Sequence, residues 1–260
     1  MNRRTFFDRI IKVGVATYIS TIITDKNIDK NRYTQLSQKI LLQTYIDNLC
    51  ATFPQTIPGA KKIEKILTDE SEYCIIHLKE SHPVDDEYMI QNYKNETLAD
   101  FVARVQHNSF LIADYLCRIY PIKKLYIEGV TDQIESQINE AFYDRDGEII
   151  FQALEEMGEI VGIGFNNIHI SATESLELQR IAQMANKETG TKHRYEYTLE
   201  QQQKIFDDRE KEAFERMMQE DDFIKLIAYG KEHTFQYETE KWNAHHQEKI
   251  SLIEITPSED

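Results

Sequence analysis

Short apolar runs alternate with longer segments of helical periodicity over most of this 260-residue chain. Four runs are short and rich in β-branched or aromatic residues, which is typical of buried strands: YCIIHL (73–78), KKLYIEG (123–129), FIKLIAY (223–229) and ISLIEIT (250–256). Residues 97–120, between the first two runs, carry apolar residues at helical spacing and end at a proline. A strand, a helix and a second strand in this order predict a right-handed βαβ crossover.

The rest of the pattern extends the same alternation. EIVGIGF (159–165) and NIHIS (167–171) predict two more short strands, and residues 199–221 predict a long charged helix. We therefore expect one three-layer α/β/α domain with a largely parallel or mixed sheet over residues 71–257. Residues 31–70 are expected to form a helical lead-in of two helices, interrupted at FPQTIPGA.

The first 30 residues have a different character. A basic region that begins with Arg3 and Arg4 precedes an uncharged stretch over 13–24, which is too short for a comfortable membrane span. NRRTFF resembles a twin-arginine export signal. We expect an exported protein, periplasmic or tethered to a membrane by this segment. The alternative is an amphipathic helix on a cytoplasmic protein.

Composition narrows the class of partner. Hydrophobic residues make up 41% of the chain, enough for a packed core, and the formal net charge of −15 argues against a nucleic-acid partner. A small molecule or a peptide is the expected substrate, and the oligomeric state is left open. Three cysteines do not make a disulfide framework, and Cys74 and Cys117, which lie in apolar segments, are expected to be buried thiols.

Three of the predicted strands end in polar residues of the same kind. Glu80 and His82 follow the first strand, Glu128 the second, and His233 the strand at 223–229. Because parallel strands bring their carboxyl ends to one edge of a sheet, we expect these side chains to meet there. Carboxylate and imidazole groups bind divalent first-row metals and also transfer protons near neutral pH. The alternative for each residue is a solvated loop position after a strand.

An arginine breaks the pattern of the helix at 199–221. Ile205, Arg209, Ala213 and Met217 are spaced four apart and share one face, so Arg209 lies on the apolar stripe. An inward guanidinium needs a carboxylate or an anionic ligand, unless it extends to the helix edge and reaches solvent.

Other histidines are expected to have no role in a site. His77 and His169 lie within predicted strands and are expected to be hydrogen-bonded packing residues. His245 and His246 are expected at the surface.

Several segments, taken in order, resemble the erythromycin-esterase/ChaN-like group, which also holds the TraB/PrgY and Tiki proteins. The segments are IIHLKESHP, VQHNSFLIADYL, KKLYIEGV, FQALEEMGEIVGI with NIHISATESLELQRIA, DDREKEAFERM, and IKLIAYGKEHTF with ISLIEITP. The resemblance covers roughly residues 70 to 257 and implies the same α/β fold. It places the group's Glu-Gly at Glu128 and Gly129, its Arg at Arg209, and a weaker candidate at Glu174. Lys79 stands where the group has a glycine.

The residues and the resemblance together predict a metal-dependent hydrolase of a peptide or ester bond. Glu80, Glu128 and Arg209 are the catalytic candidates, and His82, His233 and Glu80 are the candidate ligands of a divalent metal ion. Members of the group differ in activity, so the alternatives are a non-catalytic exported protein that binds haem or a metal, and an interaction protein on a degenerate site.

Overall fold

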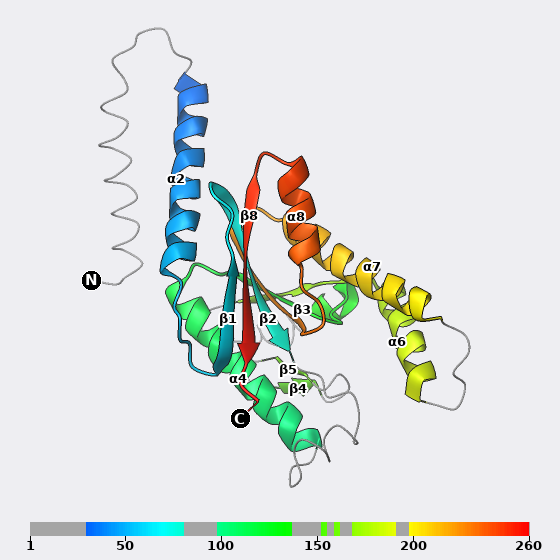
Figure 1. The fold of residues 1–260 in the computed structure, drawn as a ribbon. Coiled ribbons are helices and arrows are strands. Elements are labelled where there is room, and N and C mark those ends of the chain that lie inside the picture. Colours follow the sequence, from blue (N-terminus) through cyan, green and yellow to red (C-terminus); the bar gives the residue numbers. More distant parts are fainter. Residues whose placement is uncertain are drawn as a thin grey trace.

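A computed structural model describes residues 30–80, 98–136, 152–154, 159–161, 168–190 and 198–259 (Figure 1). The helices are α2 (Lys30–Thr52), α4 (Leu98–Ile119), α6 (Leu176–Gly190), α7 (Leu199–Met218) and α8 (Gln236–His245). The strands are β1 (Ala60–Ile66), β2 (Ser71–Glu80), β3 (Lys124–Ile127), β4 (Gln152–Leu154), β5 (Glu159–Val161), β6 (His169–Ala172), β7 (Ile224–Gly230) and β8 (Lys249–Pro257).

Six strands form one mixed sheet in the order β1-β8-β2-β7-β3-β6. The neighbours from β8 to β6 are all parallel, and β1 pairs antiparallel with β8 at one edge. The predicted α/β fold is confirmed. The parallel order places the carboxyl ends of β2, β7, β3 and β6 next to one another, and this is the edge where the sequence predicts a site.

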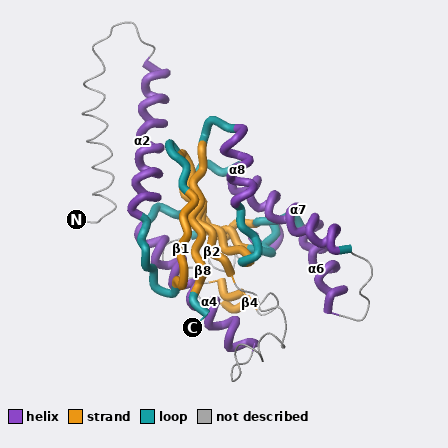
Figure 2. The backbone as a smooth tube through the Cα atoms, in the orientation of Figure 1, coloured by secondary structure: helices purple, strands orange, loops and turns teal. Residues whose placement is uncertain are grey.

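Helices cover both faces of this sheet (Figures 1 and 2). Apolar residues of α2 and α4, including Ile46 and Leu116, form one core cluster with alternate residues of β2 such as Ile76. The other face packs against α7 and the α8 region through a second cluster that includes Phe214 and Phe235. Successive strand residues point to opposite faces, so the near-continuous apolar runs read from the sequence supply both cores.

The lead-in differs from the prediction in its second half. The predicted first helix is observed as α2, but the predicted second helix is wrong, because Ala60–Ile66 forms β1 on the sheet edge. Ile63 and Ile66 are three residues apart, a spacing that also fits a helix. The exposed charges of the strand, Lys61, Lys62 and Glu64, are of the kind that protects an edge strand. Residues 30–70 thus pack on the same sheet as the rest of the domain.

Parts of the prediction lie outside the described residues. These are the signal-like segment apart from residue 30, most of the predicted strand at 159–165, and the segment that contains His82. The described part of that strand, β5, pairs with β4 in a separate two-stranded sheet. Among the helices that the structure describes, none is long and apolar enough to cross a membrane.

Candidate active site at the carboxyl ends of the strands

The chain brings the predicted strand exits together at one edge of the sheet. Glu80, the last residue of β2, is the register partner of Gly230, the last residue of β7. The Glu80 carbonyl accepts a hydrogen bond from the Lys231 backbone N–H at 2.7 Å. On the other side of β7, the Glu128 backbone N–H donates to the Ala228 carbonyl at 2.9 Å. Glu80 and Glu128 therefore flank the end of one strand.

Arg209 on α7 reaches this edge and joins two carboxylates. Its Nε and Nη2 donate to Oε2 and Oε1 of Glu174 at 2.9 and 2.8 Å, and Nη2 also lies 2.9 Å from Oε1 of Glu128. Burial alone would lower the pKa of Arg209, but the hydrogen bonds with Glu174 raise it above its ordinary value. The inward guanidinium predicted from the helix pattern is thus balanced by protein carboxylates.

Backbone N–H groups complete the hold on both carboxylates. Gly230 donates to Oε2 of Glu128 at 2.6 Å, and Gly129 donates to Oε1 of Glu174 at 2.8 Å. Gly129 has φ +76°, a conformation that glycine adopts without strain. The chain turns at this residue, where the Gly129 N–H donates to Glu174. The side chain of Glu174 is fully buried, and that of Glu128 is 14% exposed. Each carboxylate is held in one position by a cation and a backbone donor.

Glu80 is in a different state. The residue is 8% exposed, and the Oε2 atom of its side chain is buried without a hydrogen-bond partner in the described part of the chain. Burial, reinforced by the negative charge of Glu128, raises the pKa of Glu80 to about 7. Glu80 therefore exchanges its proton near neutral pH. Glu128 and Glu174, in contrast, each form an ion pair with Arg209.

His233 lies beyond the end of β7 in an aromatic setting. Its Nδ1 lies 3.3 Å from Oε2 of Glu210, and its ring stacks on Phe206 with centroids 3.5 Å apart. Tyr229 contacts the same ring edge-on and also lies under the Arg209 guanidinium. His233 is thus separated from Arg209 by the Tyr229 ring, and its Nδ1 faces Glu210.

Lys79, which stands where the resembled group has a glycine, directs its side chain away from the candidate site. Its Nζ bonds to Oε2 of Glu254 at 3.1 Å, on β8, the neighbour of β2 that lies away from β7 and β3. His77 is fully buried, as expected for a packing residue, and its Nε2 lies 3.2 Å from the Tyr229 carbonyl oxygen. His169 is likewise held within the fold, by Glu135 at 2.8 Å.

Only some of the predicted metal ligands lie among the described residues. Glu80 offers a buried oxygen, but both oxygens of Glu128 already have partners, and His82 lies outside the described residues. Across the described ranges, no three His, Cys, Asp or Glu side chains come close enough to hold one ion. The residues in view therefore do not by themselves make a metal site.

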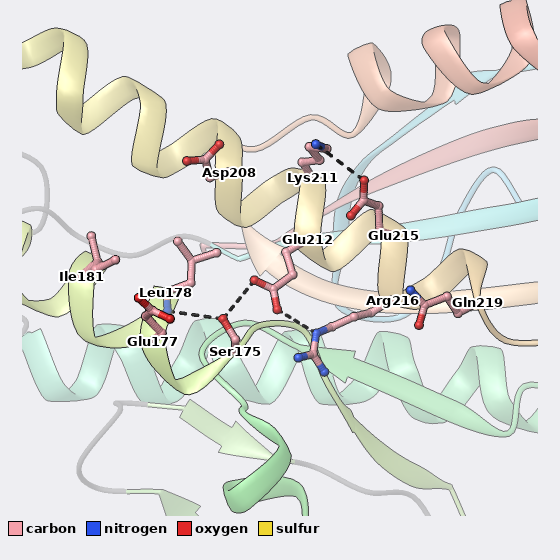
Figure 3. Close-up of a pocket in the computed structure, with 10 residues that line it drawn as sticks. All are labelled: Ser175, Glu177, Leu178, Ile181, Asp208, Lys211, Glu212, Glu215, Arg216 and Gln219. Carbon is pink, nitrogen blue, oxygen red and sulfur yellow. Dashed lines mark hydrogen bonds and ion pairs between the residues drawn. The ribbon is translucent and has the colours of Figure 1, made fainter.

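A polar groove of about 650 Å³ lies between α6 and α7, next to this edge (Figure 3). Figure 3 shows Glu212 between Ser175 and Arg216, and Arg216 continues to Asp132 at 2.7 Å. These charges satisfy one another, and the groove lies on the helical surface rather than over Glu80. The strand ends therefore remain the candidate site.

No protein-family model, curated protein or solved structure matches this chain. The resemblance to the erythromycin-esterase/ChaN-like group therefore stays a prediction. What the geometry defines is a cluster of buried carboxylates around one arginine.

Two residues of this region have a more central place in the structure than the sequence predicted. Glu174 was only a weaker candidate, yet it is the main partner of Arg209. Glu210 was missed, although Phe206, Glu210 and Phe214 are spaced four apart and border the buried face of α7. The argument that identified Arg209 as an inward charge applies equally to Glu210.

Proposed function

We propose that this protein is a hydrolase of an ester or peptide bond, of the erythromycin-esterase/ChaN-like kind, with Glu80 as its general acid and base. One observation carries the proposal. Glu80 has a buried carboxyl oxygen without a partner in the described residues, beside a second carboxylate, and its pKa is about 7. A group with this pKa is present in both protonation states at neutral pH, as proton transfer in two directions requires.

The roles follow from the contacts. As a carboxylate, Glu80 takes a proton from the attacking water, and as an acid it returns the proton to the leaving oxygen or nitrogen. Glu128 keeps the pKa of Glu80 high through its charge and is itself anchored by Gly230 and Arg209. Arg209 is mainly a positioning residue, because Nε and Nη2 already serve two carboxylates.

A divalent metal ion is a separate part of the proposal, with Glu80, His82 and His233 as its ligands. A bound cation would polarise the scissile carbonyl and acidify a water molecule. The charge of the cluster supports this choice, since two carboxylates share one guanidinium and a third, Glu80, lies near Glu128. The Nδ1 contact of His233 with Glu210 is also typical of histidines whose Nε2 binds a metal.

Metal binding without catalysis is the second candidate, and the same excess of carboxylates favours it. Haem is favoured less, because its propionates would be repelled by Glu80 and Glu128. In either case, export remains a prediction from the first 30 residues.

Activity against chromogenic esters and a peptide library tests the proposal, with Glu80→Gln compared against the wild type. We expect Glu80→Gln to lose roughly 10²–10⁴-fold in kcat/KM, the range for general acid–base groups. Glu232→Gln is the matched control, because Glu232 is an exposed glutamate after the neighbouring strand and should leave activity unchanged. Unchanged activity in Glu80→Gln would exclude the proposed role.

The metal is tested on the same proteins. After treatment with EDTA, Mn²⁺, Zn²⁺ or Co²⁺ should raise the Tm of the wild type, and less so that of His233→Gln. No shift with any ion would remove the metal from the proposal and leave the acid–base role of Glu80 in place.

A further inference from the structure

Two cysteines that are distant in the sequence meet in the core. Cys50 lies in the last turn of α2 and Cys74 in β2, and their sulfurs are 3.8 Å apart. Both are buried, in the apolar cluster between α2 and the sheet. The sequence predicted buried thiols at Cys74 and Cys117 and, from three cysteines, no disulfide framework.

The two thiols are arranged for a bond to each other. Each is a free thiol, and the sulfurs need to approach by about 1.8 Å to reach the length of a disulfide. Hydrogen bonding with Cys74 lowers the pKa of the Cys50 thiol, and the same contact together with burial raises that of Cys74 well above its usual value. While the two thiols are in contact, Cys50 is therefore the one that ionises more readily.

Cys117 differs from this pair. It belongs to the same core cluster but lies on α4, and burial raises the pKa of its thiol to about 12. In the part of the chain that the structure describes, its sulfur has no sulfur neighbour. The third cysteine serves as an internal control.

We propose that Cys50 and Cys74 are a redox-active pair that closes to an intramolecular disulfide as the chain folds in the presence of a small-molecule disulfide such as oxidised glutathione, before burial shields both sulfurs. The Cys50 thiolate attacks one sulfur of the oxidant, forms a mixed disulfide and releases one thiolate. The Cys74 thiol then loses its proton, and its thiolate attacks the Cys50 sulfur and displaces the second. Two cysteine thiols are oxidised, and one glutathione disulfide is reduced to two thiols.

The bond would tie α2 to a strand in the interior of the sheet. β2 lies between β8 and β7 and carries Glu80 at its end. The crosslink would close the chain segment that contains β1 and so reduce the entropy of the unfolded chain. For a loop of this length, the chain-entropy model predicts a rise in Tm of about 5–10 °C. This inference does not depend on the hydrolase proposal.

Thiol counting in the full chain tests the pair. The reduced protein is unfolded, refolded in a mixture of oxidised and reduced glutathione, and quenched with acid. Titration in denaturant should then find one free thiol instead of three. Peptide mapping should find the Cys50 and Cys74 peptides joined in the monomer, and the oxidised protein should melt at the higher temperature.

Two variants separate this outcome from others. Cys117→Ser should go from two free thiols to none under the same conditions, whereas Cys50→Ser should form no intramolecular bond. The wild-type peptide map decides the question even if Cys50→Ser does not fold. Three free thiols after refolding, a bond that includes Cys117, or a bond between two chains would each overturn the proposal.

Discussion

The raised pKa of Glu80 makes a prediction about stability that needs no substrate. The change from the usual value of 4.5 to about 7 means that the folded protein binds this proton more tightly than the unfolded chain does. The associated stability is fully present below pH 4.5 and is lost as pH rises through 7. At 1.36 kcal/mol per pH unit, the loss is about 3 kcal/mol.

Glu80→Gln removes this pH dependence while keeping the shape of the protonated side chain. The free energy of unfolding of the variant, relative to that of the wild type, should rise by about 3 kcal/mol between pH 4 and pH 8. Titrating groups that do not interact with Glu80 are shared by both proteins and cancel in the difference, and the change includes the coupling of Glu80 to Glu128. The variant should thus be more stable than the wild type at pH 8 while, under the proposed function, losing activity.

Urea unfolding followed by circular dichroism at four pH values between 4 and 8 measures the difference. Glu232→Gln, at an exposed position, should give a difference that does not change with pH. A constant difference between Glu80→Gln and the wild type would refute the reasoning, because it would mean that Glu80 is ionised in the folded protein as readily as in the unfolded chain.

Three further substitutions test the structure through urea unfolding. Arg209→Met should lose about 3–5 kcal/mol, because it leaves two buried carboxylates without a cation, whereas Arg118→Met, which breaks an exposed pair, should lose under about 1 kcal/mol; equal losses would contradict the buried cluster. Gly59→Ala should lose at least about 1 kcal/mol, since φ is +81° and the new Cβ would lie 2.6 Å from the Asn108 carbonyl oxygen; no loss would exclude this close approach. Thr198→Ala should lose about 1 kcal/mol through the capping box of α7, and an unchanged midpoint would argue against that cap.

The architecture could largely be predicted from the sequence, because period and length distinguish buried strands from amphipathic helices. The runs at 73–78 and 250–256 are too short and too continuously apolar to be surface helices, and both are strands of the sheet. The exception is β1. Its apolar residues fit a helix as well as an edge strand, and only pairing with β8 decides between the two.

The candidate site divides in the same way. The sequence by itself indicated that Glu80 and Glu128 lie at strand ends and that Arg209 lies on an apolar helix face. Only the tertiary structure decided that Arg209 binds Glu174 and Glu128, that His233 turns to Glu210, and that two thiols 24 residues apart touch. Periodicity is a local property of the chain, whereas the partner of a buried charge or thiol depends on which distant elements share a face of the sheet.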